Sequence, residues 1–181
     1  MDYGVYIHIP FCKRKCFYCD FPSEAGKEGQ MKDYVRALVK EIQTVGRAAA
    51  NENGMPRTIY IGGGTPSILS RPMMENVLCA VCEVFLKKKA MGKNRQDFEF
   101  TVECNPGTVS LDKLRSFRSF GVNRLSLGTQ SFQDRLLKKI GRIHTSAETV
   151  EAVQAARRAG FTNISLDLMY ALPGETLNGI E

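Results

Sequence analysis

The sequence predicts an α/β protein built on a parallel β-sheet. Five short runs rich in β-branched and aromatic residues alternate with segments whose apolar residues recur at helical spacing. The segment between one run and the next is long enough for a helix, which is the connection that parallel strands need. No linker or low-complexity tract interrupts this alternation, so we expect one domain that takes in residues 1–181.

Each predicted strand is a short apolar run, and the first three are stopped by residues that favour turns. The first ends at Pro10, the second at a run of three glycines, and the third at the sequence Asn-Pro-Gly. The expected strands are residues 3–9, 58–61, 98–103, 123–128 and 163–170.

The predicted helices have apolar residues on one face and capping residues at their ends. Apolar side chains recur every three or four positions from Val35 to Val45, which is the spacing of one helix face. The expected N-caps of the later helices are Ser70, Ser110 and Ser146. The expected helices are residues 31–45, the segment from Ser70 to Lys88, residues 111–120 and residues 146–160.

These β–α units are too few to close an eight-stranded (β/α) barrel, so the sequence predicts a partial, incomplete barrel. Polar and glycine-rich segments follow the strands: a cysteine-rich segment after the first strand, then "GGGTPS", "ECNPG" and "GTQSF". The carboxyl ends of parallel strands meet at one edge of a sheet, and α/β proteins carry their chemistry at that edge. We therefore expect a functional site there.

The composition, 43% hydrophobic and 24% charged residues, is typical of a globular protein. The chain has no apolar run of membrane-spanning length, and its first residues, with an acid at Asp2, do not match a secretory signal. We expect a cytoplasmic protein, or one of an organelle matrix if a targeting segment was removed.

The net charge of +6 comes without a nucleic-acid-binding motif, so no nucleic-acid partner is expected. The basic cluster at 87–95 is interpreted as a solvated helix end.

Cys12, Cys16 and Cys19 lie in the segment "FCKRKCFYCDF" with the spacing C-x3-C-x2-C. Three thiolates so close in sequence can converge on one metal centre. The three cations at positions 13–15 supply positive charge that favours the ionised thiols. This cluster is the strongest functional signal in the sequence.

Three interpretations of these cysteines are open from the spacing alone. A structural zinc site needs four protein ligands, and the candidate for the fourth, His8, lies inside the first predicted strand. A disulfide or incidental buried thiols would not require this spacing. A [4Fe–4S] cluster held by three cysteines instead of four leaves one iron open to a small molecule, and this interpretation matches the spacing best.

The segment "CKRKCFYC", with an aromatic residue before the last cysteine, resembles the radical S-adenosylmethionine (radical SAM) superfamily. The resemblance implies that the three cysteines bind a [4Fe–4S] cluster whose open iron is chelated by the amine and carboxylate of S-adenosylmethionine. An electron from the cluster then cleaves this cofactor to a 5'-deoxyadenosyl radical. The resemblance also implies a partial barrel of the radical SAM type, with residues 1–181 as its core domain and the carboxyl-terminal part of the family fold absent.

Other segments resemble the oxygen-independent coproporphyrinogen III oxidase-like branch of this superfamily. These are "YIHIPFC", "IYIGGGTPS", "E-x-NP" (residues 103–106), "NRLSLGTQSF", "GRIH" and "DLMYALPGET". By this resemblance, eight residues are expected to contact S-adenosylmethionine: Tyr18, Gly63, Gly64, Thr65, Glu103, Gln130, Arg142 and Asp167. The chemistry agrees, because an arginine suits the carboxylate of the cofactor, and acidic and amide side chains suit its ribose hydroxyls and ammonium.

Phe21 separates two functions within this branch. The oxidases carry a further cysteine at that position, whereas phenylalanine resembles the relatives regarded as haem chaperones. The favoured function is therefore a haem chaperone that binds the cluster and S-adenosylmethionine, and an enzymatic activity is not assigned. The alternatives are oxygen-independent coproporphyrinogen III dehydrogenase, which carries out an oxidative decarboxylation in haem biosynthesis, and a non-enzymatic zinc-binding α/β module. The implied partners are haem or a porphyrin, an electron donor such as a flavodoxin or ferredoxin, and a membrane-associated haem acceptor.

Several further residues are not expected to bind the cluster or S-adenosylmethionine. His8 is expected to support the cofactor loop, and His144 is expected either to touch haem or to be structural. Cys79 and Cys82 fall within a predicted helix and are interpreted as small buried hydrophobic residues, while Cys104 is left unassigned. Ala171 stands where this family usually has glycine. If that position needs a positive φ, alanine strains the turn by about 1 kcal/mol.

Overall fold

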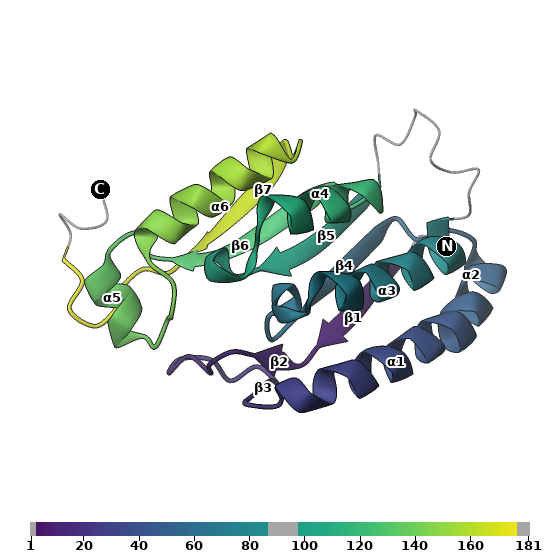
Figure 1. Ribbon diagram of the computed structural model, residues 1–181, viewed down its shortest axis with the longest axis horizontal. Coiled ribbons are helices and arrows are strands. Elements are labelled where there is room, and N and C mark those ends of the chain that lie inside the picture. Colours follow the sequence, from purple (N-terminus) through teal and green to yellow (C-terminus); the bar gives the residue numbers. More distant parts are fainter. Residues whose placement is uncertain (1–2, 87–97, 177–181) are drawn as a thin grey trace.

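A single parallel sheet runs through the computed structural model, which describes residues 3–86 and 98–176. Its strands follow the order β1-β4-β5-β6-β7, and each neighbouring pair is parallel (Figure 1). The strands are β1 (Gly4–Ile9), β4 (Thr58–Gly63), β5 (Glu99–Cys104), β6 (Arg124–Gln130) and β7 (Asn163–Leu168). All five predicted strands are therefore confirmed, with small shifts at their ends.

Helices connect these strands and form a layer along one face of the sheet (Figure 1). In this layer α1 packs against α3, α3 against α4, and α4 against α6. The helices are α1 (Met31–Glu41), α2 (Arg47–Asn53), α3 (Arg71–Val81), α4 (Leu111–Ser119), α5 (Asp134–Lys139) and α6 (Ser146–Arg158). Single π-helical turns extend α1 and α3, and short 3-10 turns precede α1 and follow β4 and β5: Ile42–Gly46, Cys82–Leu86, Glu28–Gln30, Pro66–Ile68 and Pro106–Thr108.

The helix boundaries differ from the prediction in three places. The helix expected to end at residue 45 continues through a π-turn into α2, and α5 was not predicted. Ser146 is not the cap of α6. Thr145 holds that position, because its Oγ accepts from the Glu148 amide while the Glu148 carboxylate accepts from the Thr145 amide. The basic cluster at 87–95 lies outside the described residues.

The two faces of the sheet have different chemistry, because successive side chains of a strand point to opposite sides. One set faces the helices and is almost completely buried: Ile7, Ile9, Ile59, Ile61, Phe100, Val102, Leu125 and Leu127. The alternate set is polar or aromatic: Tyr6, His8, Tyr60, Thr101, Glu103, Arg124 and Ser126. The helix side is thus the hydrophobic core, and the other side is free to bind polar ligands.

The sheet stays open. Within the described residues, β1 and β7 form its two edges and do not pair with each other, which confirms the predicted partial barrel. A second, two-stranded sheet of β2 (Phe11–Cys12) and β3 (Glu24–Ala25) lies at the base of the cysteine-rich segment. None of the helices in the described ranges has both the length and the apolar character needed to cross a membrane.

Candidate functional site

The cysteine-rich segment is a loop between β2 and β3 that hydrogen bonds fold back on itself. The Cys19 amide donates to the Cys16 carbonyl over 3.2 Å. The Lys15 ammonium donates to the carbonyls of Phe21 and Ser23, over 3.2 and 3.4 Å. Lys15 thus has a structural part in the loop in addition to its charge.

Arg142 ties this loop to the end of β6. One terminal nitrogen donates to the Cys16 sulfur over 3.7 Å, and the other donates to the Gly128 carbonyl. The Phe17 amide also donates to the Ile140 carbonyl, at the end of α5, over 3.0 Å. Residues more than a hundred positions apart in the sequence therefore meet beside the cysteines.

Two adjoining cavities lie at this edge of the sheet. The cysteine cavity is lined by Cys12, Cys16, Cys19 and the three cations that separate the first two. The strand-end cavity, of about 200 Å³, lies at the carboxyl ends of the strands. Residues that line the strand-end cavity include Tyr18, Cys19, Phe21, Gly63, Gly64, Thr65, Glu103, Asn105, Ser126, Gln130, Arg142 and Asp167. All eleven residues expected from the sequence to bind the cluster or S-adenosylmethionine line one cavity or both.

The glycine segment after β4 packs directly against the start of the cysteine loop. The amides of Gly64 and Thr65 donate to the carbonyls of Ile9 and Phe11, each over 2.8 Å. A Cβ on Gly64 would lie 2.6 Å from the Phe11 carbonyl oxygen, so only glycine allows this approach. As a result the Thr65 hydroxyl lies 3.6 Å from the Cys12 sulfur, as a donor.

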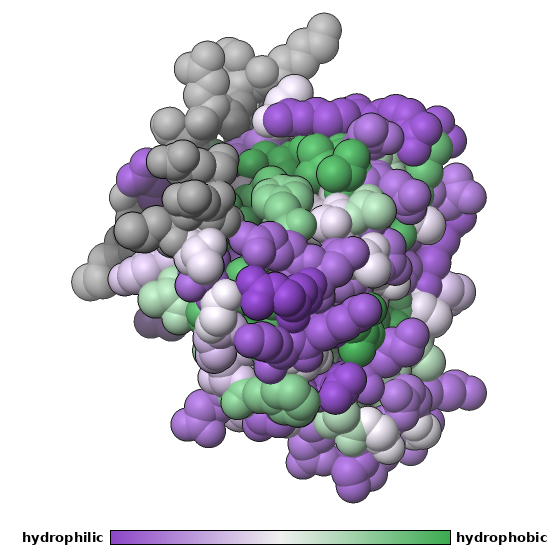
Figure 2. All heavy atoms as spheres, turned by 90° about the vertical axis from the view of Figure 1, so that its left-hand side faces the viewer, coloured by the Kyte–Doolittle hydropathy of each residue, from purple (hydrophilic) through white to green (hydrophobic). Residues whose placement is uncertain are grey.

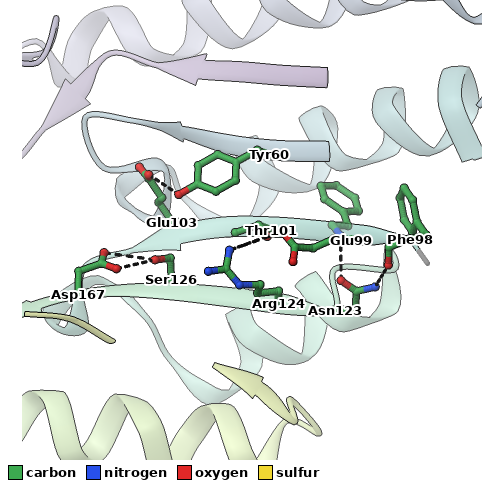
Figure 3. Close-up of polar contacts among 10 residues, drawn as sticks. Tyr60, Phe98, Glu99, Thr101, Glu103, Asn123, Arg124, Ser126 and Asp167 are labelled. Atoms are coloured by element: carbon green, nitrogen blue, oxygen red, sulfur yellow. Dashed lines mark hydrogen bonds and ion pairs between the residues drawn. The ribbon is translucent and has the colours of Figure 1, made fainter. Parts of the chain in front are cut away.

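Two carboxylates at the strand-end cavity are held by hydroxyl groups, of Tyr60 and Ser126, that the sequence did not single out. The Glu103 carboxylate accepts from the Tyr60 hydroxyl over 2.6 Å and from the Gly63 amide over 3.1 Å. The Asp167 carboxylate accepts from the Ser126 hydroxyl over 3.0 and 3.2 Å. Figure 3 shows both carboxylates toward the carboxyl ends of their strands, each with its hydroxyl partner on the adjacent strand.

Gln130 also lines the strand-end cavity, and its backbone conformation is unusual. Its φ is +66°, in the left-handed region that side chains other than glycine rarely adopt. The register between β6 and β7 shifts between Leu127 and Gln130, which is the mark of a β-bulge. Bulges and strained residues are common beside functional sites, where they direct a side chain.

Burial determines the acid–base state of several groups near the cysteines. Burial, reinforced by the neighbouring Cys16 and Cys19, raises the pKa of Tyr18 to about 12, although Arg142 opposes the shift. Burial also raises the pKa of Cys104 to about 12, so this thiol stays protonated at neutral pH. Cys104 therefore lacks the thiolate character of a metal ligand.

The expected burial of the C-x2-C pair, Cys79 in α3 and Cys82 in the π-turn after it, is wrong for Cys79. Cys79 is exposed, with its sulfur 3.6 Å from a carboxylate oxygen of Glu83. Cys82 is half-buried, and its thiol donates to the Phe120 carbonyl over 3.1 Å. The helical spacing placed Cys82 correctly, but Cys79 faces outward.

Each histidine has a partner for at least one ring nitrogen. His8 Nδ1 lies 3.0 Å from the Tyr6 hydroxyl and Nε2 lies 2.9 Å from the Pro22 carbonyl, so His8 supports the cysteine loop as expected. His144 is only 3% exposed, and its Nε2 lies 3.1 Å from the Thr129 carbonyl.

Three cysteine thiols are a donor set that would hold an iron–sulfur cluster. In the part of the chain that the structure describes, no three side chains of histidine, cysteine, aspartate or glutamate are arranged to hold a single metal ion. The three thiols nevertheless share the wall of one cavity. Two polar atoms beside it, Arg142 Nε and Asn105 Oδ1, are buried and have no hydrogen-bond partner among the described residues. The site therefore offers thiols together with unused polar groups, which suits a cluster with a polar ligand.

A parallel α/β sheet with a three-cysteine loop at its carboxyl edge defines a class of cluster-binding proteins, and comparison with known proteins agrees. The family model of the radical SAM superfamily matches residues 6–181. The chain belongs to this superfamily, and membership implies a [4Fe–4S] cluster and S-adenosylmethionine.

The similar proteins narrow the class further. The chain is 42% identical to a protein named heme chaperone HemW from Lactococcus lactis, over 98% of this chain and 44% of the relative. It is 43% identical to the protein of the same name from Escherichia coli, over 96% of this chain and 44% of the relative. The crystal structure of coproporphyrinogen III oxidase HemN from Escherichia coli superimposes with a TM-score of 0.83 at 29% identity, and covers 99% of this chain and 39% of the oxidase. The chain thus spans less than half the length of these relatives.

Proposed function

We propose that Cys12, Cys16 and Cys19 hold a [4Fe–4S] cluster and that S-adenosylmethionine occupies the strand-end cavity with its amino-acid end toward the cysteines. The observation that supports this most strongly is that the two cavities adjoin, with six residues in the walls of both. Residues 1–181 would then form the radical SAM core domain. When bound, the cluster supplies the electron for reductive cleavage of the sulfonium.

Different residues of the strand-end cavity bind different parts of the cofactor in this proposal. Arg142 has a buried Nε–H without a partner in the described residues, which suits the carboxylate of the cofactor. The carboxylates of Glu103 and Asp167 suit the ribose hydroxyls. The Gly63–Thr65 segment presents backbone and hydroxyl groups to the amino-acid end, and Tyr18 lies beside the adenine. Gln130, directed by its bulge, supplies an amide to the same cavity.

We further propose that the protein containing this core is a haem chaperone and not an oxidase. The similarity to relatives named haem chaperones over almost the whole chain supports this. Phe21 supports it as well, because its ring lies at the strand-end cavity, stacks on His8 at 6.1 Å and provides no thiol there. Haem is the cargo in this proposal. His144, which is buried, and His8, with both nitrogens engaged, are poorly placed to ligate it.

The outer surface of the cysteine loop suits an acidic electron donor such as a flavodoxin or ferredoxin. Lys13 and Arg14 are exposed there, and Arg14 lies over the ring of Phe17, which is 70% exposed. Figure 2 views this side of the molecule and shows mainly hydrophilic residues with smaller hydrophobic patches. Charge complementarity of this kind speeds the encounter of redox partners. A membrane-associated haem acceptor would be a further partner.

The test is anaerobic reconstitution of the chain with iron and sulfide, followed by iron analysis and absorption spectroscopy. We expect about four irons per chain, and loss of the cluster in Cys16→Ser. Cys82→Ser is the matched control, because this thiol lies in the π-turn that follows α3, outside both cavities. A wild-type chain that takes up one zinc ion and no iron would contradict the proposal.

The same preparation separates the chaperone from the oxidase. We expect haem to bind and to shift the Soret band, and we expect no protoporphyrinogen from coproporphyrinogen and S-adenosylmethionine, because position 21 lacks the cysteine of the oxidases. Turnover of coproporphyrinogen by this chain would reject the chaperone in favour of the oxidase.

A further inference from the structure

Asn105 lies at the boundary between the two cavities. Six residues line both of them: Tyr18, Cys19, Gly64, Thr65, Asn105 and Arg142. The other five are already expected to hold the cluster or S-adenosylmethionine. Asn105 is the one member of this boundary to which no function has been given.

The backbone at this position does not require an asparagine. Asn105 immediately precedes the 3-10 turn Pro106–Thr108, where asparagine ordinarily caps the turn with its side chain, yet its side chain makes no capping hydrogen bond. Its φ of −97° and ψ of 133° are extended values that any residue adopts. The side chain is therefore not explained by local structure.

The side-chain oxygen of Asn105 has no hydrogen-bond partner in the described part of the chain. Oδ1 is buried and accepts no hydrogen bond from the described residues. Nearly all buried polar atoms in proteins are paired, because a buried carbonyl oxygen without a donor destabilises the fold. An unpaired acceptor beside two cavities is arranged for a donor that enters with a ligand.

Hydrogen bonds of its backbone hold Asn105 in position. Its amide donates to the Ser67 hydroxyl over 3.0 Å, and its carbonyl accepts from the Thr108 amide and hydroxyl over 2.9 and 2.8 Å. The Lys113 ammonium then donates to the carbonyls of Ser67 and Thr108 over 2.9 and 3.0 Å. These hydrogen bonds join the loop after β4 to the loop after β5, so Asn105 is held in place without any ligand.

We propose that Asn105 binds the α-amino group of S-adenosylmethionine through Oδ1. The inference rests on the proposed function, in which the amino-acid end of the cofactor lies toward the cysteines. At that end the amino group is the hydrogen-bond donor, and Oδ1 is an acceptor. The other donors of the cofactor, the ribose hydroxyls and the adenine amine, belong in that proposal to Glu103, Asp167 and the Tyr18 region.

The test measures binding of two probes to the cluster-loaded chain: S-adenosylmethionine and the analogue in which hydrogen replaces the α-amino group. We expect Asn105→Leu to weaken S-adenosylmethionine about tenfold, the effect of one hydrogen bond to an amino group, and to leave the analogue unchanged. Asn105→Asp keeps an acceptor and should retain most of the affinity. Asn76→Leu, an exposed asparagine of α3, is the control for the substitution itself.

The outcomes separate this inference from the proposed function. Iron content and far-ultraviolet circular dichroism first establish that each variant folds and loads its cluster. If the wild-type chain binds S-adenosylmethionine and Asn105→Leu binds it equally well, or weakens both probes equally, the inference is wrong while the proposed function stands. A wild-type chain that binds neither probe overturns both.

Discussion

The Glu103 carboxylate has its orientation set by two donors before any ligand arrives. The Tyr60 hydroxyl and the Gly63 amide each donate to a different oxygen of this carboxylate. Burial raises the pKa of Tyr60, and the hydrogen bond to Glu103 raises it further, so the phenol stays protonated and remains a donor. Such a partner spares the ligand the cost of ordering the carboxylate.

We therefore predict that Tyr60→Phe weakens S-adenosylmethionine binding by about three- to tenfold without loss of iron, because the net value of one hydrogen bond is about 1 kcal/mol. Equilibrium titration of the cluster-loaded chain measures it. Tyr3→Phe is the matched control, since the Tyr3 hydroxyl makes a bond of the same 2.6 Å length to the Gly54 carbonyl, outside both cavities. Equal affinities of Tyr60→Phe and the wild type would show that Tyr60 is only structural.

The residues that the sequence predicted are those that belong to contiguous motifs. Cys12, Gly64 and Arg142 stand in segments whose spacing or resemblance identified them, and the cavities contain them. Tyr60 and Ser126 stand in two of the same segments, but the resemblance gave them no role. Each acts through a carboxylate on a neighbouring strand, and the strand register that pairs them is a tertiary property. Their alternation with buried apolar residues was the only signal in the sequence.

At the scale of elements, prediction succeeded where hydrophobic periodicity is long and failed where it is short. Strands β1, β4, β5 and β6 and the helices α3, α4 and α6 each bury a regular apolar face, whereas β7, an edge strand, has no fully buried residue. Helix α5, Asp134–Lys139, is too short to show a period, and tertiary contacts hold it in place. Leu136 packs against Leu172, Arg135 donates to the Gly174 carbonyl, and Asp134 accepts from the Ser146 amide. The π-turn after α1 was likewise not predicted; at its end Gly46 lies so close to Phe85 that a Cβ would come within 2.8 Å of the ring.

The turn after β7 holds a strained alanine, as the sequence suggested. Ala171 has a φ of +59°, which costs an alanine about 1 kcal/mol more than a glycine. We predict that Ala171→Gly raises the free energy of unfolding by up to about 1 kcal/mol, measured by urea denaturation. The control is Ala159→Gly, because Ala159 has a φ of −78° at the end of α6 and should lose about 0.5–1 kcal/mol. A loss of stability in both variants would contradict the strain.

At the scale of the whole molecule, the hydrophobic core and the cavities lie on opposite faces of one sheet. Apolar side chains on the helix side form the core, whereas the polar face and the strand ends form the cavities. This division explains why residues in the cavities can be strained, unpaired or glycine without loss of the fold. His144 is an exception, because it is buried close to both regions, with Arg142 and Glu148 nearby.

The pH dependence of folding should report this histidine. Burial, and then the charge of Arg142, lowers the pKa of His144 below its ordinary value of 6.5. Above pH 6.5 the ring is neutral in both states, so the full stability is present. As the pH falls below 6.5, His144 binds a proton in the unfolded chain but stays neutral in the folded chain. The free energy of unfolding therefore decreases until the pH reaches the lowered pKa of the folded state.

We predict that the free energy of unfolding of the wild type falls between pH 6.5 and 5 with a slope that His144→Gln removes in part. The contribution of one proton is at most about 1.4 kcal/mol per pH unit. Urea midpoints measured from pH 8 to 5 on wild type and variant, in the same cluster state, give this difference, and the carboxylates common to both proteins cancel. The slope is the readout, since the variant can be less stable at every pH for reasons of packing. Parallel curves for the two proteins would mean that His144 titrates alike in the folded and unfolded chain, and its burial would then carry no electrostatic cost.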